Sequence, residues 1–445
     1  MIKFLNNLYT EVVNSKYMRD ILVLTSGVGV SQLIPLLLLP ILTRFFSPTE
    51  FGVLAVYMAI VQLLAISSTF RLEMAVILPK NDTDAAILCL RAFLSLFIIS
   101  VLLFCLSFFC LKYVTGNPST VVHELIDQEY DVTSIGATQF ILNNPIIIYL
   151  IPIGSLCLGL YNILYSWNNR MELYKNMSYS HITHSIFSTP LSVLFYFSSF
   201  KSFALILGQI IGRFFACLLL LQNLLKTIFR IPSNTLITQS SSLVKEYRKF
   251  IIYETPHAIL NFFSQKIIIA VFTVFFGFFT VGIFDLADKI IGKPLGVISN
   301  SFKTVFYKRL TTAKDKLNIF KKSILLMTLI SCILIIPFYI IPDGFFIFLL
   351  GPEWYDTGKY IKLLCPLLLS RFIFNVVSPS ISYTLQNHYL LIWQIIYFIL
   401  LVFLFYSIYT FTVEDVLLCY ALLGACMYIV LGYVSFLVLK KHIKY

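Results

Sequence analysis

The chain has 445 residues, of which 59% are hydrophobic and 12% charged, and its formal net charge is +12. Soluble domains carry roughly 25% charged residues, so this composition excludes a soluble enzyme or a soluble binding module. Apolar runs long enough to cross the hydrocarbon core as helices, about 20 residues each, recur from end to end. The predicted fold class is therefore an all-α integral membrane protein.

Twelve membrane-spanning helices are predicted. In chain order their ranges are 21–43, 50–70, 85–112, 143–166, 177–199, 203–225, 251–277, 281–303, 323–341, 358–384, 391–411 and 416–438. Residues 1–20 are too polar to span, but Leu5, Leu8 and Val12 recur at helical spacing. This first segment is expected to lie along the inner membrane interface.

Two junctions between apolar runs repeat one another at a constant offset of 230 residues. Residues 44–52 read RFFSPTEFG and residues 274–282 read VFFGFFTVG, so Phe45, Phe46 and Gly52 align with Phe275, Phe276 and Gly282. A repeat at half the chain length predicts two related six-helix bundles, residues 1–228 and 229–445. Transporters built from such repeats commonly place their substrate site between the halves.

Lys and Arg are distributed very unequally between the two sides of the membrane. With the N-terminus inside, 22 of the 33 fall in inside segments and only two, Arg44 and Lys201, fall outside. The positive-inside rule therefore predicts that both chain ends lie in the cytoplasm. The net charge of +12 reports topology, and no nucleic-acid partner is expected.

The predicted loops are short and carry no motif for catalysis. No Walker A sequence, HExxH or GxSxG occurs, so neither an ATP-driven pump nor these hydrolase classes are indicated. His181 and His184 share one face of a predicted helix, and we expect a polar contact between helices there rather than a metal site. No enzyme activity, metal or cofactor is predicted.

Charged side chains in the middle of predicted helices are the informative part of the chain. Each costs about 2.5–3.5 kcal/mol to insert, so such residues usually face a hydrated cavity or a partner. Arg213, Lys266 and Arg371 lie near the centres of the sixth, seventh and tenth predicted helices. We expect these cations to line a cavity. The other candidates for its lining are Lys289, Asn261, Gln265 and Asn375.

The eighth predicted helix carries two carboxylates that allow two interpretations. Asp285 and Lys289 stand at i and i+4 with the acid first, which is the favoured order for an ion pair within one helix. Asp288 has only the adjacent Lys289 in its own helix, and adjacent residues do not face each other. Asp285 and Asp288 are therefore candidates for ion coupling, with a structural pair as the alternative for Asp285. Both a proton and a sodium gradient stay open as driving force.

Six motifs carry a resemblance to a known family. They occupy residues 41–52, 70–80, 159–170, 247–256, 282–294 and 351–358. In order, from about residue 20 to 440, the chain resembles Wzx-type O-antigen flippases. These flippases form part of the polysaccharide-transport branch of the multidrug/oligosaccharidyl-lipid/polysaccharide (MOP) exporter superfamily.

The resemblance implies a MATE-like fold and a flippase of the bacterial inner membrane. Its substrate would be an undecaprenyl-pyrophosphate-linked oligosaccharide of O-antigen or capsule type, moved to the outer leaflet by alternating access of the two bundles. The cavity cations would bind the pyrophosphate. The membrane lipids, a polysaccharide polymerase and a chain-length regulator are the expected partners.

Two other functions are compatible with parts of the pattern. A cation-coupled multidrug exporter of the same superfamily would favour a carboxylate-lined cavity, whereas the mid-helix residues are mostly basic. A membrane polysaccharide polymerase would be expected to show a sizeable outside loop or a catalytic His/Asp pair, and neither is apparent in the sequence.

The predicted topology is tested by reporter fusions. Fusions after residues 128 and 350 are expected to score as periplasmic, and fusions after residues 240 and 312 as cytoplasmic, because the excess of Lys and Arg holds the latter segments inside. A cytoplasmic signal at residue 128 contradicts the orientation.

Overall fold

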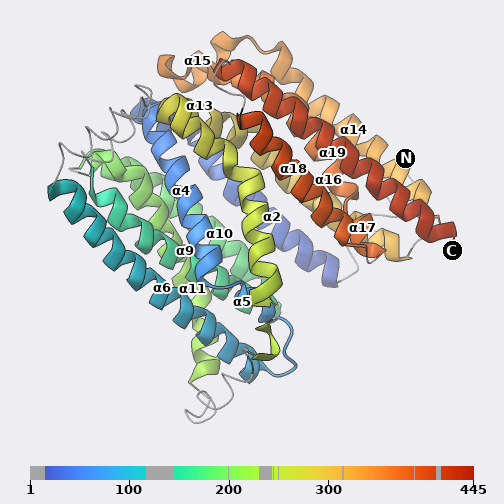
Figure 1. Cartoon of the computed structure of the whole chain (residues 1–445), viewed down its shortest axis with the longest axis horizontal. Coiled ribbons are helices and arrows are strands. Elements are labelled where there is room, and N and C mark those ends of the chain that lie inside the picture. The colour runs from blue at the N-terminus through green and yellow to red at the C-terminus, as the bar shows by residue number, and fades with distance from the viewer. Residues whose placement is uncertain are drawn as a thin grey trace. The chain divides into compact units, whose positions relative to one another are not determined.

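The structure is a computed structural model that describes residues 16–116, 144–198, 200–229, 243, 245–248, 250–312, 315–384, 386–406 and 412–444. Most of the interfacial segment predicted for residues 1–20 lies outside these ranges. The described residues form helices and contain no strand (Figure 1). The prediction of an all-α fold is confirmed.

The chain divides into two compact units. Unit 1 comprises Met1–Leu38 and Val53–Phe262, and unit 2 comprises Leu39–Gly52 and Phe263–Tyr445, of which the described residues are discussed below. These bounds differ from the predicted bundles 1–228 and 229–445 in two places. The junction 39–52 belongs to unit 2, and the described residues between 243 and 262 belong to unit 1. The division into two six-helix repeats stays a prediction.

The helices of unit 1 begin with α2. They are α2 (Lys16–Leu37), most of α4 (Pro48–Ser68), α5 (Leu72–Ala75), α6 (Asp82–Gly116), α9 (Ile146–Arg170), α10 (Tyr174–Tyr196), the short η1 (Lys201–Phe203), α11 (Ala204–Ile228) and the π-helical turn η2 (Phe250–Glu254).

The helices of unit 2 begin with the short helix of the first junction. They are α3 (Leu39–Phe45), most of α13 (Thr255–Thr312), α14 (Lys316–Ile340), α15 (Asp343–Leu350), η3 (Pro352–Trp354), α16 (Thr357–Val377), α17 (Pro379–Tyr383), α18 (His388–Tyr406) and α19 (Val413–Lys444).

Ten helices of the described chain are long and apolar enough to cross a membrane. One of them, within α13, contains both the seventh and the eighth predicted helices, which meet at Gly277 with φ 77° and ψ 175°. A positive φ is accessible to glycine, so the turn can be made without a loop. The fifth predicted helix is present as α10, whose serines, threonines and histidines lower its hydropathy. The chain is a multi-pass membrane protein.

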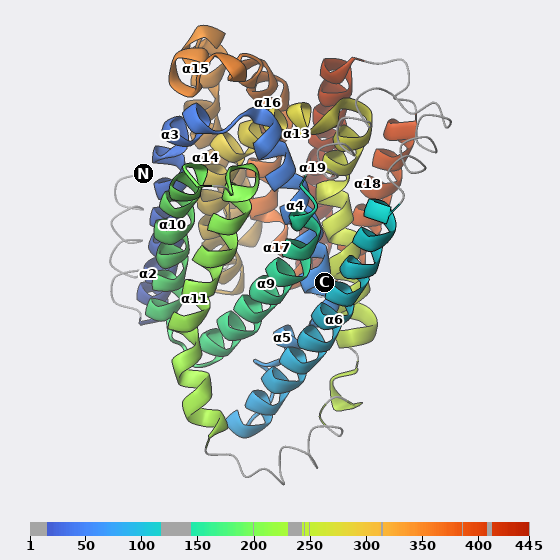
Figure 2. The ribbon, with the colours of Figure 1, turned by 90° about the vertical axis from the view of Figure 1, so that its left-hand side faces the viewer.

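Small residues hold α10 in unit 1. A Cβ atom at Gly212 of α11 would lie 2.8 Å from the carbonyl oxygen of His184, and one at Gly208 would lie 2.5 Å from that of Ser188. The Ser185 hydroxyl donates to the carbonyl of Ser31 on α2 at 2.6 Å. Glycines bring helix backbones together in lipid, where van der Waals contact and hydrogen bonds replace hydrophobic attraction. Figure 2 shows α2, α10 and α11 side by side.

The repeated junctions pack against each other inside unit 2. A Cβ atom at Gly52 would overlap the carbonyl oxygen of Phe278, and one at Gly282 would overlap that of Pro48. Gly52 and Gly282 are equivalent under the offset of 230, and so are Pro48 and Phe278. The two contacts are therefore the same contact made twice, which is the pattern of a local two-fold axis.

The first junction is also fixed by a capping box at the start of α4. The backbone N–H of Ser47 donates to Glu50 Oε2 at 2.8 Å, and the Glu50 N–H donates to Ser47 Oγ at 3.4 Å. Pro48 occupies the first helical position, where its missing N–H costs nothing. The sequence SPTE thus stops α3 and starts α4 within two residues.

The motif at residues 351–358 anchors this junction to α15 and η3 in unit 2. Trp354 is fully buried, its Nε1–H donates to the carbonyl of Thr43 at 3.1 Å, and its ring meets Phe51 edge-on at 5.1 Å. Arg44 Nη2 donates to the carbonyl of Phe348 at 2.7 Å. These contacts explain why residues 39–52 belong to unit 2.

The close approach at Gly282 predicts a position-specific stability loss. Gly282→Ala is expected to destabilise the protein by about 1–3 kcal/mol, since the methyl group overlaps backbone that cannot move independently. Gly296→Ala is the matched control, because a Cβ atom there meets nothing within 4 Å. Melting temperatures in detergent report both variants, and equal values contradict the predicted contact.

Candidate substrate site

The second half of α13 carries the charged face that the sequence indicated. Asp285 is buried and forms an ion pair with Lys289, one turn further along the helix. The expected pair within one helix is therefore present. Lys289 neutralises the Asp285 carboxylate in the membrane interior, where an isolated charge is costly. A coupling role for Asp285 stays a prediction.

Asp288 has a partner on another helix. Arg371 Nη2 of α16 donates to Asp288 Oδ1 at 3.3 Å, and each of the two side chains is 35% exposed. A Cβ atom at Gly292 would lie 2.7 Å from Asp288 Oδ1 and 3.0 Å from Arg371 Nη2, so glycine leaves room for the pair. The long distance and the partial exposure describe an ion pair that a stronger ligand can open.

Two further lysines, Lys266 and Lys293, lie in the same part of unit 2. Lys293 is exposed and lies within electrostatic range of Asp285, Asp288, Lys289 and Lys266. Four cationic side chains thus accompany two carboxylates in this part of unit 2. The excess of positive charge makes it a candidate anion site, which we call the α13–α16 cluster. It consists of Lys266, Asp285, Asp288, Lys289, Lys293 and Arg371.

Arg371 is backed by aromatic side chains that the sequence reasoning did not single out. Tyr420 and Tyr428 of α19 lie near its guanidinium group. Trp393 of α18 stacks at a tilt on Tyr428, with ring centroids 5.4 Å apart, and donates to the carbonyl of Met427 at 2.7 Å. The signal available in the sequence was the spacing of Tyr420 and Tyr428 at i and i+8, which places them on one face of α19.

The predicted amides fall in different places. Asn375 on α16 accepts a hydrogen bond from Lys303 Nζ at 3.2 Å, which joins the inner part of α13 to α16. Gln265 is exposed on the first half of α13 in unit 2, and Asn261 is exposed in the part of α13 that belongs to unit 1. Their roles in substrate binding stay predictions.

Arg213 belongs to unit 1 and has a different environment. Its guanidinium carbon lies 4.6 Å from the centroid of the Tyr161 ring, in cation–π geometry. Among the described residues no ion pair joins Arg213 to a carboxylate. It lines a small cavity together with Tyr57, Cys157 and Gln209.

The histidine next to this arginine makes the expected contact between helices. His181 Nδ1 lies 3.5 Å from the Tyr161 hydroxyl, and its Nε2 lies 3.4 Å from the Tyr165 hydroxyl. Ser180 Oγ and the Tyr161 hydroxyl are 3.1 Å apart. These contacts connect α10 to α9 and fix the Tyr161 ring that Arg213 contacts.

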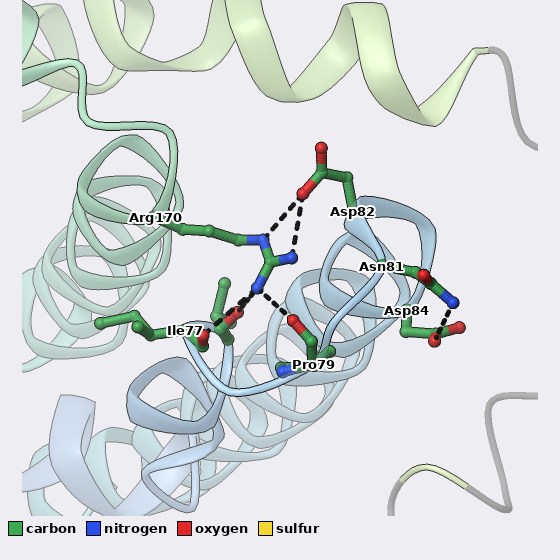
Figure 3. A network of polar contacts seen from close by, with 7 residues as sticks. Ile77, Pro79, Asn81, Asp82, Asp84 and Arg170 are labelled. Carbon is green, nitrogen blue, oxygen red and sulfur yellow. Dashed lines mark hydrogen bonds and ion pairs between the residues drawn. The ribbon is translucent and has the colours of Figure 1, made fainter.

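Three of the sequence motifs meet at the end of unit 1 that is predicted to lie in the cytoplasm. Arg170, the last residue of α9, donates through Nε and Nη2 to Asp82 at 3.0 and 2.9 Å (Figure 3). Its Nη1 donates to the carbonyls of Val76, Ile77 and Pro79 at 3.1, 3.3 and 2.7 Å. Tyr247 packs against an apolar cluster that includes Leu72, Val76 and Trp167. Arg170 thereby uses its planar donors to fix the connection from α5 to α6.

A family model described as "Polysaccharide biosynthesis protein" matches residues 17–307. The search of curated proteins finds no match.

Several solved transporters have a similar structure. A multidrug resistance MATE family transporter of the MOP superfamily, in an inward-facing conformation, is 12% identical over 95% of this chain and 94% of that chain, with a TM-score of 0.66. A MATE in complex with MaL6 is 12% identical over 98% and 99%, with a TM-score of 0.61. A MOP superfamily transporter from Pyrococcus furiosus, described as having a binding pocket of reverse polarity that suggests a different function, is 10% identical over 98% of both chains, with a TM-score of 0.56. At these identities the likeness shows a MATE-like fold.

The ion pair within α13 predicts the outcome of a charge exchange. Asp285→Lys or Lys289→Asp alone places like charges one turn apart, which costs about 4 kcal/mol for unit charges at an effective dielectric constant near 20. Each single variant is expected to reduce the amount of folded protein in the membrane. The double exchange, Asp285→Lys with Lys289→Asp, is expected to restore it, as measured by size-exclusion chromatography of membrane extracts.

Transport by the exchanged protein separates the two roles of Asp285. A structural pair tolerates the exchange, so folding and much of the transport return together. Restored folding without transport assigns a coupling role to Asp285, since the carboxylate has then moved by one turn. Failure of the exchange to restore folding contradicts the predicted pairing.

Proposed function

The chain belongs to the polysaccharide biosynthesis protein family, and from this premise we propose that it is a flippase for undecaprenyl-pyrophosphate-linked oligosaccharides. It moves the sugar repeat unit from the cytoplasmic to the periplasmic leaflet of a bacterial inner membrane. The family match over residues 17–307 and the MATE-like fold support a membrane transporter of polysaccharide biosynthesis. Its family and its fold neighbours are transporters rather than enzymes.

The observation that carries the choice of substrate is the charge of the α13–α16 cluster. A pyrophosphate diester has a negative charge on each phosphate, and the cluster holds more cationic groups than carboxylates. Lys289 and Arg371 already hold carboxylates, whereas Lys266 and Lys293 are available to bind first. Charge-assisted hydrogen bonds from Lys and Arg are the strong contacts available to a phosphate.

Binding of the pyrophosphate to Arg371 would displace Asp288. The pair is long and partly exposed, and a guanidinium binds a phosphate through two parallel hydrogen bonds more strongly than it binds this carboxylate through one. A displaced Asp288 is then free to take up a proton or a sodium ion. This exchange links substrate binding to the coupling role expected for Asp288.

A multidrug exporter is the second candidate, because one neighbour is named as a multidrug resistance transporter. The excess positive charge of the α13–α16 cluster disfavours cationic drugs. The neighbour whose pocket is described as having reverse polarity indicates that this fold accommodates pockets of different charge. A polysaccharide polymerase and a chain-length regulator are the proposed partners of the flippase.

Lys266 supplies the test of the pyrophosphate site. Lys266→Ala is expected to reduce flipping of a lipid-linked oligosaccharide in proteoliposomes by about ten-fold or more, since a hydrogen bond to a charged group contributes about 1.5–3 kcal/mol. Lys266→Arg is expected to retain part of the activity because it keeps the charge but changes the shape.

Lys245→Ala is the matched control, because Lys245 is exposed and lies outside the membrane spans. Both proteins must be present at the wild-type level for the comparison to hold. Wild-type flipping by Lys266→Ala removes this residue from the site. Export of a cationic dye, without flipping of the lipid-linked oligosaccharide, overturns the proposed function in favour of the multidrug exporter.

A further inference from the structure

A buried carboxyl group lies at the end of unit 1 that the positive-inside rule places in the cytoplasm. Glu73 belongs to α5, in the connection between α4 and α6 and outside the membrane spans. It is 2% exposed. A carboxylate is almost never buried to this degree unless it is paired and fully hydrogen-bonded.

The polar atoms around Glu73 are only partly satisfied. Arg71 Nη1 contacts Glu73 Oε1 at 3.4 Å, which is long for a charge-assisted contact. The Thr69 hydroxyl donates to the carbonyl of Ala65 at 3.2 Å. Glu73 Oε2, Arg71 Nε and Ser68 Oγ are buried without a hydrogen-bond partner. Three such atoms within six consecutive residues call for an explanation. A protonated carboxyl lowers the cost, because it buries no net charge.

The backbone holds this arrangement under strain. Phe70 and Arg71 have φ values of 48° and 55°, in the left-handed region that residues other than glycine rarely adopt. The conformation persists because Leu72 and Val76 are packed into the apolar cluster around Trp167. Arg170 fixes the residues that follow, as Figure 3 shows. Strained backbone conformations cluster at active sites and switch regions, so strain beside a buried titratable group suggests a functional role for this turn.

Arg71 is the charged group that acts on Glu73 among the described residues. The elements packed against α5 are α6, α9 and η2. Their nearby charged groups are Asp82 and Asp84 on α6, Arg170 on α9 and Glu254 on η2. Arg170 and Asp82 bind each other, so neither offers Glu73 a counter-charge.

Burial raises the pKa of Glu73 above that of a free glutamate, and Thr69 and Arg71 oppose the shift only in part. The packed form of the turn therefore binds a proton more tightly than an open form does. Its stability is greatest at low pH and is lost as the pH rises through the raised pKa. This direction is the opposite of that for a carboxylate held by a good ion pair.

We propose that Glu73 is a proton-binding group that couples the inner end of unit 1 to cytoplasmic pH. The carboxyl is protonated while the turn 68–76 is packed. When the turn opens, Glu73 gives its proton to water and the exposed carboxylate is solvated beside Arg71. Repacking takes a proton from the cytoplasm. The link to transport rests on the proposed flippase function, whereas the protonation itself does not.

Difference infrared spectroscopy of the purified protein tests the protonation directly. A wild-type minus Glu73→Gln spectrum is expected to show the C=O band of a protonated carboxyl near neutral pH, and this band is lost as the pH rises. Glu246→Gln is the matched control, because Glu246 is exposed on the same side of the membrane, and its difference spectrum is expected to lack the band. Absence of the band from the Glu73 spectrum across the acidic and neutral range overturns the proposal.

Stability gives a second measurement. Glu73→Gln resembles the protonated acid, so it is expected to keep the wild-type melting temperature and to abolish the fall in melting temperature that the wild type shows as the pH rises. A large loss of stability in Glu73→Gln that Arg71→Gln repairs identifies an ionised structural pair and contradicts the proposal.

Transport in proteoliposomes completes the test. The pH dependence of wild-type flipping is expected to be reduced or lost in Glu73→Gln and retained in Glu246→Gln, at constant sodium concentration. An unchanged pH profile in Glu73→Gln overturns the coupling role. If no variant flips the oligosaccharide at any pH, the flippase function fails, and the infrared and melting measurements still decide whether Glu73 binds a proton.

Discussion

The cost of placing a charge or an unpaired polar group in hydrocarbon constrains this structure throughout. Each such group must find a partner inside the protein or face water. The chain answers with an ion pair within one helix, Asp285–Lys289, and with an ion pair between helices, Asp288–Arg371. Around Lys266 and Lys293 the cationic side chains outnumber the carboxylates, and an anionic ligand can balance the excess positive charge. The same physical cost therefore explains the pairing of the charged helices and supports the proposed anionic substrate.

Close backbone contact is the second constraint, because apolar side chains alone do not drive helices together in lipid. Gly208 and Gly212 bring α11 to α10, and the equivalent glycines Gly52 and Gly282 bring the two junctions together. In unit 2 the two copies of the junction sequence make the same backbone contact, Gly52 with Phe278 and Gly282 with Pro48. A substitution that adds one methyl group at either glycine must move backbone, so these positions tolerate little change.

The proposed transport cycle combines these features. A pyrophosphate competes with Asp288 for Arg371, while Glu73 responds to the proton concentration at the inner end of unit 1. Both carboxyl groups lie more than 3 Å from an arginine. In the proposed cycle Asp288 loses Arg371 to the pyrophosphate, whereas Glu73 is protonated in the packed turn and releases its proton when the turn opens. Coupling of this kind requires no cofactor and no ATP-binding motif.

Hydropathy and charge are local properties, so the sequence by itself determined the membrane class and the approximate positions of the helices. It also predicted the orientation and offered the Asp285–Lys289 pair as one of two interpretations, which the structure then showed to be formed. The sequence also contained the junction repeat. Only the tertiary structure decided which helices are neighbours. The partner of Asp288 lies 83 residues away, and Trp354 bonds a carbonyl 311 residues away. Glu73 reads as an ordinary loop residue in the sequence, because its burial depends on how α6, α9 and η2 cover α5, and no local pattern encodes that packing.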